Sequence, residues 1–350
     1  MTKKILVALF FITMMVLPVS QVSAFSLNSY HVGNSLTADA LINTGLPALS
    51  SGAGFGHTTG WHIRCAQSLN YIVNNPTETC VNPNATFGTY QPALTNFAWD
   101  VVTLQPFSGS TPENEYLAFK SMVNTSLQNQ ENADARFYVY ASWPTIPIGE
   151  TFSEKWYNED SFDPQVDDFD RVKSNFDWVY DQLINDSDLQ NVDIRMIPAG
   201  DVLAEVDSRM RSGIIPTHDL YRDSVHLTNL GRFAVANTFL AVLFNQTPEG
   251  LNSNSYFDTA PAQVTPIEIT NELALLIQDA VWDVVTSIPE TGVLVGDLDI
   301  DGFVGISDLN LVLGNWNSYN PTDSRADASG DGFVGIDDLN LVLGNWNASN

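Results

Sequence analysis

The stretch His31-Val32-Gly33-Asn34-Ser35-Leu36-Thr37 places a serine directly after a short apolar run. The composition of residues 26–32 predicts a β-strand, and Gly33-Asn34-Ser35 is typical of a tight turn between a strand and a helix. A side chain in such a turn stands at the carboxyl end of its strand. The sequence therefore predicts that Ser35 is presented at the edge of a sheet.

A second motif contains the groups that such a serine needs. A serine hydroxyl is a poor nucleophile unless a general base lies within hydrogen-bond reach and a third group orients that base. Asp223-Ser224-Val225-His226 stands just before a strongly helical run, so its two ionisable side chains can turn toward one point. Ser35, Asp223 and His226 are the predicted catalytic triad. In the alternative interpretation, Asn34-Ser35 only caps a helix and His226 packs against one.

The two motifs together resemble those of the SGNH (GDSL-like) hydrolases, whose first block carries the nucleophilic serine and whose last block is Asp-x-x-His. The resemblance covers residues 26–288, with Asn34 where the family usually has aspartate. It implies a flavodoxin-like three-layer α/β fold with an open parallel sheet. It also implies hydrolysis of carboxylic esters through a serine nucleophile, with no cofactor for catalysis.

The same resemblance implies where the donors to the oxyanion lie. In the family they are the backbone N–H of the nucleophile, a glycine of the second block and an asparagine of the third. Ala66 and Gln105 stand at the corresponding positions here. Loss of one such donor typically lowers the rate by about 10²- to 10³-fold. Ala66, through its N–H, and Gln105, through its side-chain amide, are the candidates, although an ordinary loop amide is nearly as good an interpretation of Gln105.

Alternating strand and helix patterns follow the first motif, which favours an open parallel sheet with helices on both faces. The predicted strands are residues 26–32, 62–65, 100–105, 136–142 and 193–198, and the predicted helices are 116–127 after a Thr111-Pro112 cap, 169–183, 229–245 and 266–287. Residues 289–296 are predicted to be a linker, beginning with the hinge-like Pro289-Glu-Thr-Gly292.

Residues 1–24 have the pattern of a secretory signal peptide. Lys3 and Lys4 precede the apolar run 5–17, and Val22-Ser23-Ala24 is a small-residue cleavage site. No later segment is long and apolar enough to predict a membrane span. We therefore expect a secreted protein that is extracellular or associated with the cell surface.

The net charge and the cysteines of the chain lead to two further expectations. The chain has 14 lysines and arginines against 41 aspartates and glutamates, a formal net charge of -27, which disfavours nucleic acid as a partner. Its two cysteines, Cys65 and Cys80, favour a disulfide in an exported protein, worth about 3 kcal/mol in the chain-entropy model. A pair of buried free thiols is the alternative.

The C-terminal part contains a repeat with a period of 30 residues, in which Asp301-Gly-Phe-Val-Gly-Ile306 recurs as Asp331-Gly-Phe-Val-Gly-Ile336. Oxygen ligands at loop positions 1, 3, 5, 7 and 12, with glycine at position 6, are typical of Ca²⁺ loops. The candidate ligands are Asp297, Asp299, Asp301, the carbonyl of Phe303 and Asp308 in the first loop, and Asp327, Ser329, Asp331, the carbonyl of Phe333 and Asp338 in the second.

Each loop leads into the helical pattern Ile-x-x-Leu-x-x-Val-Leu-x-x-Trp, and the whole of residues 297–350 resembles the dockerin module. This resemblance implies a small all-α domain with two EF-hand-like loops, two structural Ca²⁺ ions and a cohesin-like scaffold protein as partner. In so small a unit, bound calcium would contribute directly to folding. A calcium-stabilised end piece without a partner is the alternative.

The predicted function is that of a secreted serine esterase with a calcium-dependent docking tail. Because dockerin-like tails commonly accompany polysaccharide-degrading enzymes, the resemblance implies an acylated polysaccharide as the ester substrate. Lipid esters and thioesters would use the same triad. The competing hypothesis is a non-catalytic surface or carbohydrate-binding protein on a hydrolase-like fold.

Overall fold

A computed structural model describes residues 25–42, 45–107, 109–158, 162–166, 171–212, 219–253, 267–319 and 321–349. The predicted signal peptide, residues 1–24, lies outside these ranges. In the part of the chain that they cover, no helix is both long enough and apolar enough to cross a membrane.

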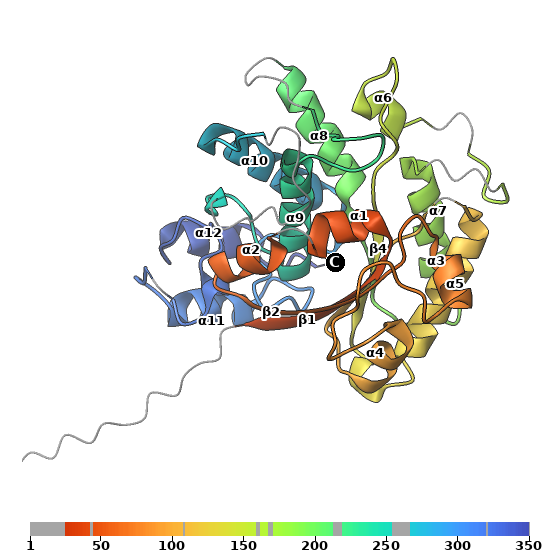
Figure 1. Cartoon of the computed structure of the whole chain (residues 1–350). Coiled ribbons are helices and arrows are strands. Elements are labelled where there is room, and N and C mark those ends of the chain that lie inside the picture. Colours follow the sequence, from red (N-terminus) through yellow and green to blue (C-terminus); the bar gives the residue numbers. More distant parts are fainter. Residues whose placement is uncertain are drawn as a thin grey trace, which may run out of the picture.

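A five-stranded sheet forms the centre of the larger domain (Figure 1). Its strands are β1 (Ser26–Gly33), β2 (Gly56–Ile63), β3 (Val101–Leu104), β4 (Arg136–Ala141) and β5 (Ile194–Pro198). They lie in the order β2-β1-β3-β4-β5, and all neighbouring pairs are parallel. This is the strand order of flavodoxin-like doubly wound sheets. The predicted α/β class with an open parallel sheet is confirmed.

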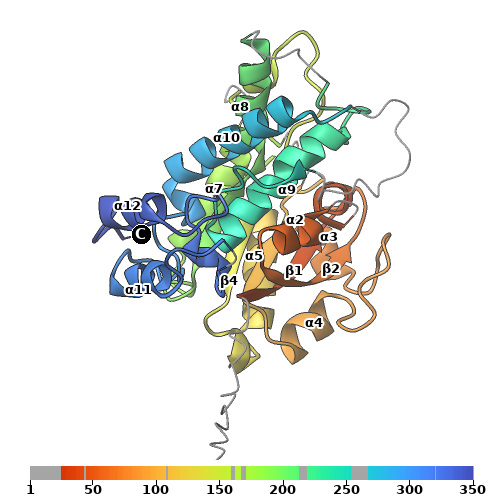
Figure 2. The ribbon, with the colours of Figure 1, turned by 90° about the vertical axis from the view of Figure 1, so that its left-hand side faces the viewer.

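Helices cover both faces of this sheet (Figures 1 and 2). The π-helical turn η1 (Ala38–Ile42), which continues α1 (Ser35–Thr37), contacts α9 (Asn229–Phe244), as do α2 (Leu46–Gly52), α8 (Ala199–Arg211) and α10 (Asn271–Ser287). A second group consists of α3 (Leu69–Asn74), α4 (Tyr90–Asn96), α5 (Pro112–Ser126) and α7 (Lys173–Ile184). The short helices η2 (Gln130–Asn132) and α6 (Phe152–Trp156) complete the domain.

Three predicted elements differ from the structure. The strand predicted at 62–65 was wrong in its bounds, because β2 begins at Gly56 and ends at Ile63. Its glycines resemble a loop in sequence, but Gly60 is needed for packing: a Cβ there would lie 2.6 Å from the Tyr30 ring. The helix predicted from 266 begins at Asn271, after a Thr270 cap. The helix predicted from 169 begins at Lys173, and residues 167–170 lie outside the described ranges.

The parallel register brings the ends of three strands together. Gly33 at the end of β1 is paired with Ile63 at the end of β2, and Val32 is paired with Leu104 at the end of β3. The carboxyl ends of these strands therefore share one edge of the sheet, which is where doubly wound folds bind ligands.

The repeated tail folds around a small core of its own, made by Leu298, Val304, Val312, Ala326, Ala328, Val334 and Val342. Its helices are α11 (Ile306–Gly314), η5 (Ser324–Ala326) and α12 (Ile336–Gly344), and isolated bridges pair Phe303 with Ser349 and Ser318 with Val334. The connection to the larger domain contains the turn η4 (Pro289–Thr291), and the carbonyl of Gly292 accepts a hydrogen bond of 3.2 Å from Arg195 of β5.

Two consecutive side chains at the end of α9 hold the tail against the larger domain. Figure 2 shows the ribbons of α11 and α12 beside the larger domain. Asn245 caps the helix in the left-handed conformation and donates from Nδ2 to the carbonyl of Asp297 at 2.6 Å. Gln246 donates from Nε2 to the carbonyl of Asp327 at 2.9 Å. Asp297 and Asp327 are the first residues of the two repeated loops, so one helix end fixes both loops.

We expect the double variant Asn245→Gly, Gln246→Ala to separate the unfolding of the tail from that of the larger domain. Glycine keeps the left-handed cap while the amide is removed. Each lost hydrogen bond should lower the free energy of unfolding by about 1 kcal/mol. Differential scanning calorimetry should show a split transition. The control Asn185→Ala removes an amide that bonds only within α7, and a split transition there, or none in the double variant, would contradict this view.

Candidate active site and metal loops

Ser35 begins α1 immediately after β1, as predicted, and its side chain is half-buried. Asn34 is the cap of this turn: its Oδ1 accepts from the Leu36 N–H at 3.0 Å and its Nδ2 donates to the carbonyl of Gln67 at 3.2 Å. Within the described ranges, neither the hydroxyl nor the backbone N–H of Ser35 forms a hydrogen bond. The capping role of the motif thus belongs to Asn34, and Ser35 is left available to a substrate.

The structure brings Asp223 and His226 together on one loop. Oδ2 of Asp223 lies 2.9 Å from Nδ1 of His226, while Oδ1 accepts from the N–H groups of Val225 at 2.9 Å and His226 at 2.8 Å. Partial burial acts to raise the pKa of Asp223, but the N–H groups of His226 and Val225 hold it below its usual value. An ionised Asp223 therefore orients the imidazole, whose Nε2 has no hydrogen-bond partner in the described part of the chain.

This loop is anchored to the segment that follows β4. The indole of Trp143 donates to the carbonyl of Val225 at 2.7 Å, and the Ile146 N–H donates to the carbonyl of Ser224 at 2.9 Å. The loop also closes on itself, because the Arg222 N–H donates to the carbonyl of His226 at 2.9 Å. His226 is thus placed at the carboxyl end of the sheet, the same edge that carries Ser35.

A residue that the sequence analysis missed connects the two motifs directly. Asp39, four residues after Ser35 on the turn η1, is buried, and its Oδ2 accepts from the Leu227 N–H at 3.1 Å. Leu227 follows His226 in the chain. The one signal in the sequence is a carboxylate among the apolar residues Leu36, Ala38, Ala40 and Leu41.

Ala66 lies in the turn after β2, exposed and with φ of 54°. This left-handed conformation favours glycine, the residue that the SGNH hydrolases have at the corresponding position. Within the described residues its backbone N–H forms no hydrogen bond. The preceding residue, Cys65, forms a disulfide with Cys80, with the two Cα atoms 5.7 Å apart. The cysteine pair therefore forms the predicted disulfide, and this bond anchors the turn.

Gln105 follows β3 and is fully buried. Its Oε1 accepts from the Asn34 N–H at 3.2 Å and from the Thr37 hydroxyl at 2.5 Å, while its Nε2 lies 3.5 Å from Oγ of Ser142. A Cβ on Gly33 would lie 2.6 Å from this Oε1, so glycine is required beside it. The carbonyl of the amide thus faces the Ser35 turn. Its role as a donor to the oxyanion stays a prediction, and the geometry favours a supporting role.

Glu115, a second residue missed in the sequence, ties together the loops after β2 and β3. It is fully buried in the first turn of α5, where Oε2 accepts from the N–H groups of Leu69 at 2.9 Å and Phe107 at 3.0 Å. Oε1 accepts from the Asn70 N–H at 3.1 Å. Burial raises the pKa of Glu115 to about 7, although these N–H groups act to lower it. One carboxyl group therefore connects the loops that carry Ala66 and Gln105.

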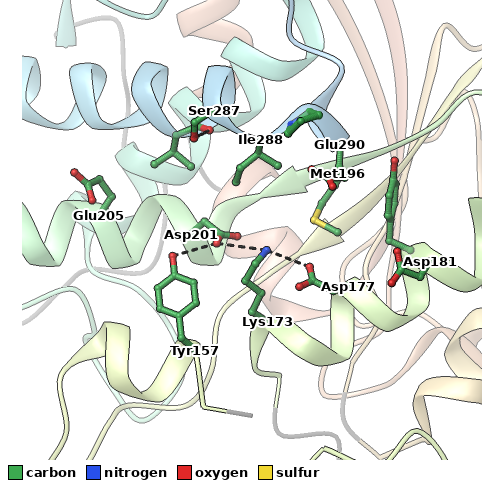
Figure 3. Close-up of a pocket in the computed structure, with 13 residues that line it drawn as sticks. Tyr157, Lys173, Asp177, Asp181, Met196, Asp201, Glu205, Ser287, Ile288 and Glu290 are labelled. Atoms are coloured by element: carbon green, nitrogen blue, oxygen red, sulfur yellow. Dashed lines mark hydrogen bonds and ion pairs between the residues drawn. The ribbon is translucent and has the colours of Figure 1, made fainter. Parts of the chain in front are cut away.

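A cavity of about 590 Å³ lies apart from these residues, between α7, α8 and the end of α10 (Figure 3). At its centre, Nζ of Lys173 lies 3.1 Å from Asp177 and 3.6 Å from Asp201, to which the Tyr157 hydroxyl also donates at 3.2 Å. None of the residues predicted for catalysis lines it. A smaller hollow of about 300 Å³, lined in part by Ile146, Leu220 and Tyr221, borders the loop of His226.

The first repeated loop has the donor set of a cation site. Asp297, Asp299 and Asp308 each offer a carboxylate oxygen, and these oxygens lie within 4.8 Å of one another. Burial, followed by the neighbouring carboxylates, raises the pKa of Asp297 to about 6, although the Gly302 N–H acts to lower it. The three carboxylates repel one another when they are ionised, and a hard divalent cation bound between them would relieve this repulsion. These residues therefore fit Ca²⁺.

The second loop repeats this arrangement with Ser329 in place of Asp299. Burial and the charge of Asp338 raise the pKa of Asp327. Gly302 and Gly332, at position 6 of their loops, have φ of 86° and 85°, as the sharp turn requires. Asp308 and Asp338 also accept the N–H groups of Gly305 and Gly335, each at 2.7 Å.

Comparisons with known proteins leave the family open. No family model matches the sequence, and no curated protein matches it. A DUF4886 family protein from Bacteroides uniformis has a similar solved structure, with 17% identity and a TM-score of 0.49 over 76% of this chain and 96% of that one. A gut microbial diltiazem-metabolizing enzyme has 10% identity and a TM-score of 0.35, over 62% of this chain and 46% of that one. At such values the likeness does not extend to function.

We expect Glu115→Gln to change how stability depends on pH. The pKa of Glu115 rises from 4.5 to about 7 on folding, so the folded chain holds this proton more tightly than the unfolded chain. Its contribution to stability is therefore present below pH 4.5 and is lost as pH rises through 7. Relative to Glu115→Gln, the parent should lose about 3 kcal/mol of unfolding free energy over that range.

Urea titrations across the pH range measure this difference. The control is Glu113→Gln, which changes an exposed carboxylate of the same helical turn and should give a curve parallel to that of the parent. A parallel curve for Glu115→Gln as well would show that the buried carboxyl group does not titrate in this range.

Proposed function

We propose that this protein is a serine esterase that hydrolyses carboxylic esters with Ser35 as nucleophile. One observation carries the proposal: the Asp223–His226 pair lies on a loop that Asp39 binds to the segment beginning with Ser35, and Nε2 of the imidazole has no hydrogen-bond partner among the described residues. A serine, a base and a group that orients the base are the parts that acyl transfer requires.

In this proposal the reaction uses these three residues in turn. Nε2 of His226 takes the proton of the Ser35 hydroxyl as Oγ attacks the ester carbonyl carbon, and Asp223 stabilises the resulting imidazolium. The tetrahedral intermediate collapses when His226 returns the proton to the leaving alcohol. Water then attacks the acyl-enzyme by the same sequence, which releases the acid and restores Ser35.

The negative charge on the tetrahedral intermediate needs preorganised donors. The backbone N–H groups of Ser35 and Ala66 are the groups we assign to it, since both are free of hydrogen bonds to the described residues. Gln105 supports them by holding the Asn34 N–H and the Thr37 hydroxyl of the nucleophile turn. The departure of Gln105 from the asparagine of the SGNH hydrolases thus leaves two donors in place.

The repeated tail supports an extracellular polysaccharide ester as the substrate and a scaffold protein as the docking partner. Corresponding apolar residues of its two repeats are exposed at the surface: Ile306 and Ile336, Leu313 and Leu343, and Trp316 and Trp346. A duplicated apolar surface of this kind favours a protein interface. In this proposal the chain is exported by residues 1–24, and Ca²⁺ held by Asp297, Asp299 and their counterparts keeps the tail folded.

A non-catalytic binding protein is the second candidate, favoured by one observation. The side-chain amide of Gln105 is engaged by the protein, so the third donor of the SGNH hydrolases is missing at its usual place. Labelling with a fluorophosphonate distinguishes the two candidates because only an activated serine reacts with it.

We expect Ser35→Ala and His226→Ala to lower kcat for p-nitrophenyl acetate by at least about 10³-fold, because the members of a triad act as one unit. Asp223→Asn should give a loss of similar order through the wrong imidazole tautomer. Initial rates, with circular dichroism to verify the fold, are the measurement. Unchanged activity in Ser35→Ala, or an inactive and unlabelled parent, would refute the esterase and leave the binding protein.

Calcium should stabilise the full chain. With free Ca²⁺ at 100 times its Kd, the expected gain over EGTA is about 2.7 kcal/mol for each loop that binds one ion, seen as a higher melting temperature of the tail. Asp297→Ala should lose the part of this gain that the first loop contributes and keep the part from the second loop. Asp337→Ser is the matched control, because it gives the exposed first turn of α12 the serine that the first repeat has at position 307. A gain that Asp297→Ala retains in full would contradict the assignment of this loop.

A further inference from the structure

We infer that Asp39 is a positioning residue for the proposed reaction, setting the approach of His226 to Ser35. The inference rests on the proposed function and adds to it a group outside the triad. Asp39 is only 2% exposed, so it does not meet the substrate and is not itself catalytic.

Both backbone polar groups of Leu227, the residue after His226, are held through Asp39. Its Oδ2 accepts the Leu227 N–H at 3.1 Å. Its Oδ1 accepts from Nη1 of Arg222 at 2.9 Å, and the same Nη1 donates to the carbonyl of Leu227 at 3.0 Å. The position of Leu227 is therefore fixed on two sides, directly by the carboxylate and indirectly through the guanidinium.

The other end of this link is the nucleophile turn. Asp39 lies in the π-helical turn η1, which continues the helix that Ser35 begins. Asp39 is four residues after Ser35 on this continuous helical segment. Leu227 is bonded to His226, with adjacent Cα atoms about 3.8 Å apart, so we expect a shift of Leu227 to be passed on to His226. One side chain thus connects the backbone at Ser35 with the backbone at His226.

A carboxylate suits this position better than an uncharged group. A second guanidinium, that of Arg232 in the first turn of α9, places Nη2 2.8 Å from Oδ1 of Asp39. Burial raises the pKa of Asp39 to about 6, while Arg232 and His226 act to lower it. Asparagine could accept from Leu227, but its amide group would then point at two cations. The substitution should therefore displace the loop without removing any group of the triad.

The test compares Asp39→Asn with Asp186→Asn in the full chain. Asp186, like Asp39, is a carboxylate paired with a cation: it lies 2.6 Å from Lys120 and accepts from the Tyr116 hydroxyl at 2.5 Å, but it stands between α7 and β5. For p-nitrophenyl acetate, Asp39→Asn should lower kcat about 100-fold, as expected for a misplacement near 1 Å, with little change in KM. Asp186→Asn should change neither.

Hydrogen exchange of the backbone gives a readout that does not depend on activity. In Asp39→Asn, amides of residues 222–228 should exchange faster, with the Leu227 amide most affected, and in Asp186→Asn they should exchange as in the parent. If Asp39→Asn does not fold, Arg222→Gln tests the link from its more exposed side, with a smaller loss of kcat in the same direction.

The outcomes separate the two proposals. An active parent combined with unchanged kcat and unchanged exchange in Asp39→Asn, or unchanged kcat in Arg222→Gln, overturns the positioning role alone. An inactive parent that a fluorophosphonate does not label refutes the esterase, and the positioning role falls with it. A kcat loss at Asp39 with normal exchange in residues 222–228 would also overturn the inference, because the loop would not have moved.

Discussion

A carboxylate that is removed from water must find its hydrogen-bond donors inside the protein. Asp39 and Glu115 are two such groups, and both find donors in the backbone of loops at the carboxyl edge of the sheet. Asp39 connects the turn after β1 with the loop of His226, and Glu115 connects the loops after β2 and β3. Because a buried polar group without hydrogen-bond partners costs free energy, these loops are held in one arrangement, and the geometry of the candidate site depends on that.

Local patterns along the sequence were sufficient to predict much of the fold. Alternating strand and helix patterns predicted β3, β4 and β5, and the Thr111-Pro112 cap predicted the start of α5, whose Asn114 N–H does bond to Thr111. The prediction of β2 was wrong because a strand that contains Gly56 and Gly60 resembles a loop until the Tyr30 ring is placed against it. Propensity within a segment carries no information about a neighbour that is distant in sequence.

The same limit applies to the site. Ser35 and the Asp223–His226 pair have local motifs, so the sequence was sufficient to single them out. Asp39 and Glu115 have none, because their partners are backbone N–H groups 188 and 46 residues away. His31 and His57 show the converse. They share the Ser29 hydroxyl inside the protein, where burial lowers their pKa values to about 3 and about 4.

The buried helix α9 connects the candidate site to the repeated tail, and this has a consequence for the proposed function. Its 16 residues span about 24 Å, from Thr228, two residues after His226, to the amides that hold both tail loops. A module on a flexible tether samples many orientations, whereas here Asn245 and Gln246 hold both loops of the tail against the end of this helix. If the proposed docking partner binds the exposed apolar residues of the tail, the partner's own orientation then sets the direction in which Ser35 faces. Under the proposed function, presentation of the candidate site would be a property of the assembly rather than of the chain alone.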